Sequence, residues 1–286
     1  MYREFFGLRE KPFNVTSDPT YLFSSRVYQE AFAHLVYGIS ERKGFIEITG
    51  EIGAGKTTLC RQLLRQLDAN TKTSLVLNST LPELQLLRGI MEDFGLDVGQ
   101  KDKGEMLQQF NSFLIEELSR GNNVILIVDE AQNLDLSTLE AIRMLSNLET
   151  DKDKLFQIIL VGQPELRDKL NSPALKQLRQ RIGVRFHMTP LDKNEVSQYI
   201  YHRLKVAGSN GEICFSDDAL EAIARYSGGV PRIINMVCDK ALLMAYVMET
   251  KDISLSMVER SIQEIEGSVS YEYNTGSFEK SAGMVG

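Results

Sequence analysis

The stretch that decides the fold is GEIGAGKTTL, residues 50–59, which directly follows the apolar run FIEIT at 45–49. Gly50, Gly55, Lys56 and Thr57 satisfy the phosphate-loop pattern GxxxxGK[ST]. The glycines let backbone N–H groups point inward around a β-phosphate, and the following helix presents its positive N-terminal end. The alternative is a glycine turn that binds nothing. The predicted nucleotide-binding residues are Gly50, Glu51, Ile52, Gly53, Ala54, Gly55, Lys56, Thr57 and Thr58.

A phosphate loop of this kind also needs a carboxylate for its metal ion. We expect Lys56 to reach the β- and γ-phosphates of ATP and Thr57 to ligate Mg²⁺. In VILIVDEAQ, residues 124–132, a buried strand ends in Asp129, which suits the Mg²⁺ shell. Glu130 points to the other side and can polarise an attacking water. A kinase must exclude water from the γ-phosphate, whereas a hydrolase benefits from a carboxylate that activates water. Glu130 therefore favours hydrolysis over a small-molecule kinase. The alternative is that Asp129 and Glu130 are only the solvated start of a loop.

Two further polar residues are candidates for contact with the γ-phosphate. Gln163 follows the apolar run IILVG. If its strand lies between those that carry the phosphate loop and Asp129, the amide faces the γ-phosphate; otherwise Gln163 is a turn residue before Pro164. Arg232, in SGGVPRIINMV (227–237), stands at the start of a helix and can reach the site from a second domain. The alternative for Arg232 is a solvated side chain.

A cluster of arginines precedes the last predicted strand, in LRQRIGVRF at 178–186. An arginine at the entrance of a strand lies at the edge of a domain, where it can enter the site of a neighbouring subunit and stabilise transition-state charge. The candidates for this finger are Arg179, Arg181 and Arg185. For each of them taken alone, a basic surface turn is the favoured interpretation.

Short apolar runs alternate with helical periodicity, which favours an α/β fold with a parallel sheet. The expected strands are 45–49, 74–78, 124–128, 156–162 and 184–188, and the expected helices between them are 56–67, 82–94, 105–119 and 137–148. The last helix begins with STLE, a capping-box spacing of Ser137 and Glu140. Its expected buried stripe is Leu139, Ile142, Leu145 and Leu148.

From residue 192 onward the apolar spacing is helical, and we expect no further strand. The predicted helices are 192–207, 217–226, 231–248 and 255–265. The expected domains are a nucleotide-binding core at 1–190 and an all-helical lid at 191–266. The tail, 267–286, is poor in aliphatic residues and rich in Gly and Ser, so we expect disorder there.

The composition limits the class of protein. The chain has 286 residues, of which 43% are hydrophobic and 25% charged, as in globular proteins. A net charge of −7 disfavours a broad nucleic-acid footprint. Cys60, Cys214 and Cys238 form no CxxC pair and indicate reduced thiols of a cytosolic protein. We find no signal peptide and no run of about 20 apolar residues, and therefore expect a cytoplasmic protein that docks at most peripherally on the inner membrane.

Taken together, these motifs resemble the AAA+ ATPases and, within them, the ExeA-type family of general secretion pathway protein A and its relatives. The matching stretches are FFGLREKPFNVTSDPTYLF, GFIEITGEIGAGKTTLCRQLL, VILIVDEAQNL, LSNLETDKDKLFQIILVGQPEL, LRQRIGVRFHMTPL, YIYHRLKVAG and GGVPRIINMVCDKAL, which cover about residues 1–265.

The resemblance implies a three-layer ASCE-type core with sheet order 5-1-4-3-2, a helical lid and ATP hydrolysis. It implies Walker A roles for Lys56 and Thr57 and Walker B roles for Asp129 and Glu130. Gln163 corresponds to sensor 1, where many AAA+ proteins have Asn, and Arg232 to sensor 2. Arg181 matches the finger position best, with Arg179 second. Relatives place N-terminal residues near the adenine; the candidates here are Pro12, Phe13 and Tyr21, with a plain core role as the alternative.

The resemblance also implies a homo-oligomer that assists a bacterial secretion, type IV pilus or exopolysaccharide system, with a protein component of that membrane-associated machine as its partner. Longer members of the family continue into a transmembrane helix and a peptidoglycan-binding region; this chain ends at Gly286 with neither, so we expect no direct binding of the cell wall. One alternative is a DNA-associated regulator that resembles the transposition ATPases MuB and TniB. Another is a static ATP-dependent scaffold with negligible turnover.

Overall fold

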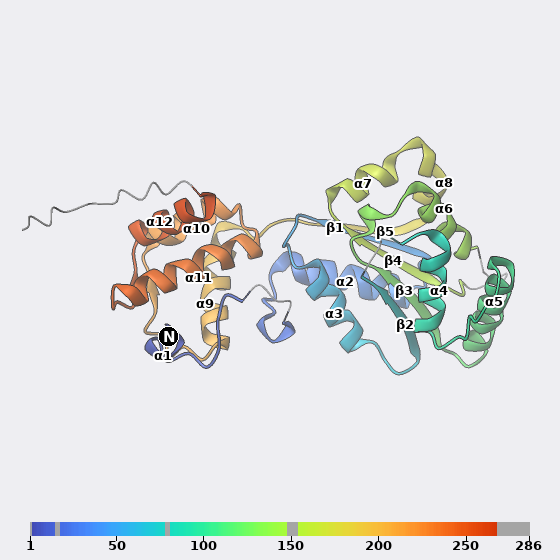
Figure 1. The fold of residues 1–286 in the computed structure, drawn as a ribbon, viewed down its shortest axis with the longest axis horizontal. Helices are drawn as coiled ribbons and strands as arrows, with labels where there is room; N and C mark the ends of the chain where they lie inside the picture. Colours follow the sequence, from blue (N-terminus) through green and yellow to red (C-terminus); the bar gives the residue numbers. More distant parts are fainter. Residues whose placement is uncertain (1, 15–17, 78–80, 148–153, 268–286) are drawn as a thin grey trace, which may run out of the picture.

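The computed structural model describes residues 2–14, 18–77, 81–147 and 154–267, which form an α/β part and a helical part side by side (Figure 1). The α/β part is built on a five-stranded parallel sheet in the order β2-β3-β4-β1-β5, which confirms the predicted order 5-1-4-3-2. Its strands are β1 (Phe45–Gly50), β2 (Thr71–Val76), β3 (Asn123–Val128), β4 (Gln157–Gly162) and β5 (Ile182–Met188). Every residue of β1 and β4 is buried, as expected where helices cover both faces of a parallel sheet.

Helices lie on both faces of this sheet and make it the middle of three layers (Figure 1). Side chains alternate between the faces of each strand. Ile125 and Ile127 of β3 join the core under α2 (Arg26–Ser40) and α3 (Lys56–Gln66). Leu126 joins the opposite core. That core is covered by α4 (Glu83–Asp93), α5 (Lys103–Ser119), α6 (Leu136–Leu145), α7 (Pro164–Asn171) and α8 (Lys176–Arg181).

The helical part confirms all four helices expected after residue 192 but is not all-helical. Its helices are α9 (Lys193–Val206), α10 (Asp217–Ser227), α11 (Pro231–Val247) and α12 (Leu255–Glu266). Two short strands, β6 (Cys214–Phe215) and β7 (Asp252–Ile253), pair in parallel, which corrects the expectation that no strand follows residue 190. A strand of two residues has no periodicity for a sequence to display, so its pairing depends on the tertiary fold.

The N-terminal segment packs with the helical part. Tyr2, Phe6 and Phe13 are buried in the same hydrophobic cluster as α9 to α12, and Tyr21 joins them. The segment contains α1 (Tyr2–Phe5) and a 3-10 turn at Pro19–Tyr21. The division into domains at residues 190 and 191 stays a prediction, but the hydrophobic contacts of this segment lie with the lid.

The start of α6 differs from the predicted capping box of Ser137 and Glu140. The N-cap is Asp135, whose Oδ1 accepts hydrogen bonds from Thr138 N at 2.6 Å and from Ser137 Oγ at 2.8 Å. Glu140 instead pairs with Arg143 at 2.7 Å. Aspartate is as good an N-cap as serine, and here it begins the helix one residue before the expected start. Of the expected stripe, Leu139, Ile142 and Leu145 are buried, whereas Leu148 lies outside the described residues, as does the tail from 268.

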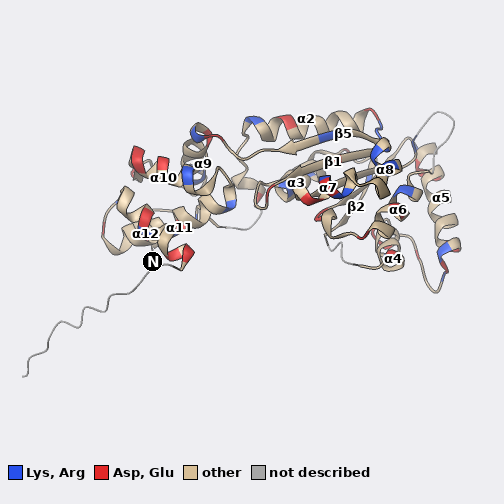
Figure 2. Cartoon of the chain, turned by 90° about the horizontal axis from the view of Figure 1, so that it is seen from above, with Lys and Arg blue, Asp and Glu red and all other residues tan. Residues whose placement is uncertain are grey.

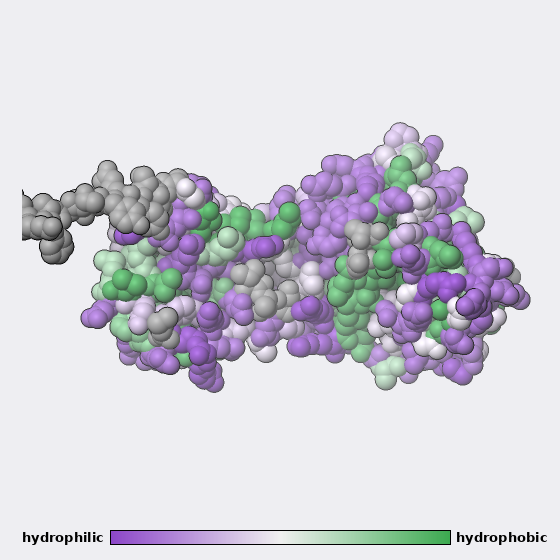
Figure 3. Space-filling model, viewed as in Figure 1, coloured by the Kyte–Doolittle hydropathy of each residue, from purple (hydrophilic) through white to green (hydrophobic). Residues whose placement is uncertain are grey.

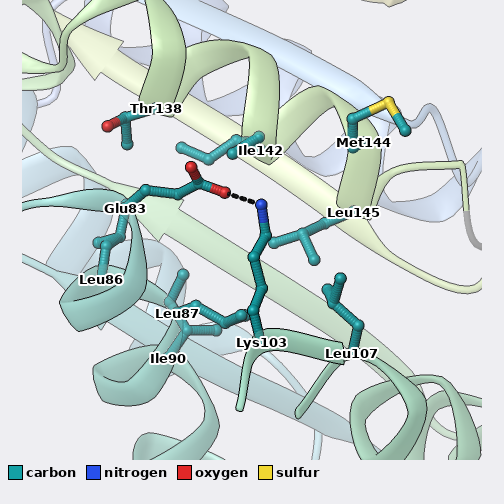
Figure 4. A pocket seen from close by; sticks show the side chains of 11 residues that line it. Glu83, Leu86, Leu87, Ile90, Lys103, Leu107, Thr138, Ile142, Met144 and Leu145 are labelled. Atoms are coloured by element: carbon teal, nitrogen blue, oxygen red, sulfur yellow. Dashed lines mark ion pairs between the residues drawn. The ribbon is translucent and has the colours of Figure 1, made fainter. Parts of the chain in front are cut away.

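An apolar groove lies between α4, α5 and α6, in the layer away from α2 and α3. Figure 4 shows Leu86, Leu87 and Ile142 among its walls, with Glu83 and Lys103 forming an ion pair of 2.5 Å across it. Figure 3 shows hydrophobic side chains exposed on one face of the α/β part. In the view of Figure 2, acidic and basic side chains are interspersed over both parts.

Candidate nucleotide site

The phosphate loop joins the end of β1 to the start of α3 at the carboxyl edge of the sheet. Gly53 and Gly55 have φ values of 82° and 97°, a left-handed conformation that costs glycine little and other residues more. Gly55 is the N-cap of α3 and has no side chain to cap it. The free N–H groups of the first helical turn therefore open toward the loop, as an anion site requires.

Lys56 directs a buried ammonium group across this loop. Its side chain is 5% exposed, and Nζ donates to the carbonyl oxygens of Gly50 at 2.7 Å and Glu51 at 2.9 Å. Burial lowers the pKa of Lys56, while the carboxylates of Glu130 and Asp129 oppose that shift. Among the described residues its hydrogen-bond acceptors are neutral carbonyls, so the charge is available to an anionic ligand such as a phosphate.

Thr57 and Asp129 meet at the position expected for a metal ion. Thr57 Oγ1 donates to Asp129 Oδ2 at 2.7 Å. Asp129 follows β3, is 3% exposed, and is held through its backbone N–H to Val76 O at 2.9 Å. A hydroxyl and a carboxylate oxygen are ligands that Mg²⁺ accepts, so these two residues fit the predicted role.

Glu130 is held by two glutamine side chains. Its backbone is left-handed, with φ 52° and ψ 37°, which is uncommon for a residue with a side chain. Glu130 Oε2 accepts from Gln163 Nε2 at 3.1 Å and from Gln132 Nε2 at 2.5 Å. The sheet places β4 between β1 and β3, so Gln163 lies where the sequence analysis expected it. That analysis missed Gln132, although it stands at the end of the quoted run VILIVDEAQ.

The lid contacts the phosphate loop at Arg232. A Cβ added to Gly53 would lie 2.4 Å from Arg232 Cβ, so only glycine permits this approach. A cavity opens at the loop between Lys56 and Glu130 on one side and Arg232 on the other. From the lid it is also lined by Tyr199, Arg203 and Asn235, which the sequence analysis did not assign to the site.

A second cavity adjoins the first and is lined by the N-terminal segment. Its lining includes Tyr21 of that segment, Tyr28 of α2, and Ala54, Gly55 and Thr58 of the phosphate loop and α3. Of the three residues predicted to lie near the adenine, only Tyr21 lines this cavity. Phe13 is 1% exposed in the core of the helical part. The carbonyl of Pro12 accepts a hydrogen bond from Arg203.

Of the three candidate finger arginines, Arg179 and Arg181 lie in the last turn of α8, directly before β5, and Arg185 lies within β5. Arg181 Nη1 donates to Ser146 Oγ at 3.0 Å, and Arg179 Nη1 to Asn171 O at 3.4 Å. Arg185 pairs with the buried Glu47 at 3.3 Å. These three arginines line neither cavity at the phosphate loop of their own chain.

Residues 39–170 match the family described as AAA domain. The chain is 43% identical over 269 residues to general secretion pathway protein A of Aeromonas hydrophila, covering 93% of this chain and 49% of that protein. It is 26% identical over 175 residues to an uncharacterized HTH-type transcriptional regulator of Methanocaldococcus jannaschii, covering 59% of this chain and 42% of the relative. The chain thus spans about half or less of the length of these curated relatives.

Solved structures share the fold. The ORC2 protein of Aeropyrum pernix aligns with a TM-score of 0.64 and 18% identity, over 90% of this chain and 72% of that one. The RuvB branch migration motor of Thermotoga maritima aligns with a TM-score of 0.57 and 18% identity, over 87% and 73%. Both likenesses confirm the P-loop core with a helical lid. No helix in the described ranges is both long and apolar enough to cross a bilayer.

Proposed function

This chain is an AAA-domain protein homologous to general secretion pathway protein A, and on that premise we propose that it binds ATP with Mg²⁺ and hydrolyses it. We further propose that hydrolysis drives conformational or assembly changes in a bacterial envelope system. The observation that carries the proposal is the convergence of Lys56, the Thr57–Asp129 pair and Glu130 at one edge of the sheet.

The residues of the loop divide the binding of nucleotide and metal between them. The backbone amides of residues 51–58 and the Lys56 ammonium bind the β- and γ-phosphates. Thr57 and Asp129 hold Mg²⁺, which would neutralise charge on the phosphate oxygens. The described residues contain no group of three or more His, Cys, Asp or Glu that could form a protein cage for a metal. This agrees with Mg²⁺, which commonly uses one or two carboxylates together with substrate phosphates and water.

Glu130 acts as the general base. It accepts a proton from the water whose oxygen attacks the γ-phosphorus, while the bond from that phosphorus to the bridging oxygen breaks and ADP retains that oxygen. Gln163 orients this water in the proposed mechanism, a role that its hydrogen bond to Glu130 supports. Arg232 carries the state of the γ-phosphate into α11 and the lid, and Arg181 serves the site of a neighbouring subunit.

Replacing Glu130 with Gln tests this proposal. The variant keeps the shape of the side chain and loses the base, so we expect it to bind ATP like the wild type and to hydrolyse it about 100- to 10,000-fold more slowly. Nucleotide binding is measured by fluorescence titration and turnover by phosphate release. Full phosphate release from Glu130→Gln would remove Glu130 from the mechanism. Lys56→Ala serves as the binding-deficient control.

A further inference from the structure

We propose that Arg203 is a positioning residue that holds part of the N-terminal segment, its residues 9–14 and 18–23, against α9 and so builds one wall of the cavity for the base and ribose. The inference deepens the proposed function and rests on it. It gives a role to two sequence motifs that the phosphate chemistry leaves unused, FFGLREKPFNVTSDPTYLF at the N-terminus and YIYHRLKVAG in α9.

The Arg203 side chain joins the N-terminal segment at three points. It is 6% exposed, and its guanidinium donates from Nε to Pro12 O at 2.5 Å and from Nη2 to Asn14 O at 3.1 Å. The same planar group lies over the ring of Tyr21, 4.5 Å from its centroid. The fork of a guanidinium can bind two carbonyls and stack on a ring at once, which the single ammonium of lysine cannot do. One buried side chain therefore contacts the segment both at Pro12 and Asn14 and at Tyr21.

The contacts continue from Arg203 toward the phosphate loop. Arg203 Nη1 donates to Tyr199 Oη at 3.0 Å, and Tyr199 Oη donates to Asn235 Oδ1 at 3.0 Å. Asn235 lies three residues after Arg232 on α11, so both face the same cavity. Burial raises the pKa of Tyr199, which keeps the phenol protonated as the donor in this chain.

The two cavities adjoin, and Tyr199 and Arg203 line both of them, together with Gly55, Thr58 and Pro231. The cavity at Lys56 and Thr57 suits the phosphates. The other cavity is walled by Tyr21, Leu22 and Tyr28, whose rings and aliphatic groups suit a planar base. Loss of the Arg203 contacts therefore removes a wall of the second cavity while the loop residues of the first remain in place.

The test compares a ligand that has a base with one that has none. Arg203→Ala and Arg203→Lys are prepared in the full chain, and the affinities for Mg²⁺–ATP and for Mg²⁺–tripolyphosphate are measured by calorimetry. We expect Arg203→Ala to weaken ATP binding about tenfold or more and tripolyphosphate binding by less than about twofold, because only ATP uses the second cavity. Arg203→Lys should give an intermediate loss for ATP. Arg260→Ala, at a position 63% exposed on α12, is the matched control.

Two results would overturn the inference. Unchanged ATP affinity in Arg203→Ala would show that the wall does not depend on Arg203, and equal losses for both ligands would show that Arg203 acts on the phosphates directly. If Arg203→Ala fails to fold, Arg203→Lys decides, because lysine keeps the charge but cannot bind both carbonyls and stack on Tyr21, and it should still show a selective loss of ATP affinity. A wild-type chain that binds neither ligand would contradict the proposed function itself.

Discussion

The side-chain amide of Gln132 links residues that follow two neighbouring strands, β3 and β4, through its nitrogen and its oxygen. Its Nε2 donates to Glu130 Oε2, and its Oε1 accepts from the backbone N–H of Gln163 at 3.1 Å. Lys169 Nζ donates to the Gln132 carbonyl at 2.5 Å and fixes the backbone. The amide fits beside β4 because Gly162 has no side chain; an added Cβ would lie 2.8 Å from Gln132 Oε1. The orientation of the proposed base thus depends on a glycine in the adjacent strand.

Gly162→Ala should therefore lower turnover more than nucleotide affinity. The new methyl group would lie 2.8 Å from both the Gln132 amide oxygen and Leu166 Cδ2, so it displaces the amide and removes a glutamine donor from Glu130. We therefore expect the rate of ATP hydrolysis to fall about tenfold, as loss of one well-placed hydrogen bond predicts. The affinity for ADP should stay within about twofold of the wild type. Steady-state phosphate release and ADP titration measure the two quantities.

The matched control is Gly89→Ala in α4, where an added Cβ meets no atom within 4 Å. This variant should hydrolyse ATP at the wild-type rate and unfold at a higher denaturant concentration, since alanine favours a helix over glycine by roughly 0.5–1 kcal/mol. A Gly162→Ala enzyme that is as active as Gly89→Ala would show that Gln132 does not position Glu130.

The residues of the site divide into those that the sequence could predict and those that it could not. Lys56, Thr57 and Asp129 were predictable because the phosphate loop and the strand that ends in an acid are local patterns. The structure brings Thr57 and Asp129 together at 2.7 Å. Gln132 was not predictable, because its role depends on the adjacency of β3 and β4. Arg203 acts through carbonyls at residues 12 and 14, about 190 positions away, which no spacing can reveal.

At the scale of secondary structure, local patterns were accurate where they repeat over several turns. The helix predicted at 82–94 forms at Glu83–Asp93, and that at 231–248 forms at Pro231–Val247. The β2 strand, expected at 74–78, instead lies at Thr71–Val76, because its residues are only partly buried and mix polar with apolar side chains. The sequence analysis did not predict α2, which carries the exposed apolar residues Val36 and Tyr37 beside its buried ones.

The α6 helix offers a test of its corrected start. Asp135 caps this helix, and its hydrogen bond from Thr138 N lowers its pKa below the usual 3.8. Asp135→Ala should reduce the free energy of unfolding by about 1 kcal/mol, whereas Ser137→Ala should change it by less than about 0.5 kcal/mol. Urea denaturation followed by circular dichroism measures both.

The pH dependence adds a second check on this cap. The pKa of Asp135 is lowered in the folded state. The contribution of its carboxylate to the free energy of unfolding is therefore fully present above about pH 4 and is lost as the pH falls through the lower, folded-state pKa. The wild type and Asp135→Ala should therefore converge in stability in acid. If Ser137→Ala lowered the free energy of unfolding more than Asp135→Ala does, the helix would be capped by Ser137, as the predicted capping box has it.

At the scale of the whole molecule, the N-terminal segment belongs to the hydrophobic cluster of the lid. Tyr2 Oη donates to Asp239 Oδ1 in α11 at 2.6 Å, and Arg9 N donates to Ala207 O at 2.8 Å. The N-terminal segment then passes Tyr21 and enters α2 beside the sheet. A movement of the lid relative to the loop would therefore carry the wall at Tyr21 with it, so the base cavity and the contact of Arg232 with the loop are mechanically linked.

The arrangement of the sheet also separates Arg181 from its own phosphate loop. Ile182, the next residue, pairs with Phe45 at the start of β1, whereas the loop follows Gly50 at the other end. The strand between them spans roughly 17 Å. Arg181 can therefore serve as a finger only in the site of a neighbouring subunit, and the rate of hydrolysis per subunit should rise with protein concentration.

Mixing two inactive variants and measuring ATP hydrolysis tests whether Arg181 acts in the site of a neighbouring subunit. Arg181→Ala should lower turnover about 1,000-fold or more, as loss of a finger does elsewhere, while ATP still binds. Lys56→Ala loses the phosphate contact but retains Arg181. When the two are mixed, Lys56→Ala subunits donate the arginine to Arg181→Ala subunits whose loops are intact, so part of the activity should return. A wild-type rate per subunit that stays constant on dilution to the monomer, together with no recovery on mixing, would show that each subunit hydrolyses ATP alone.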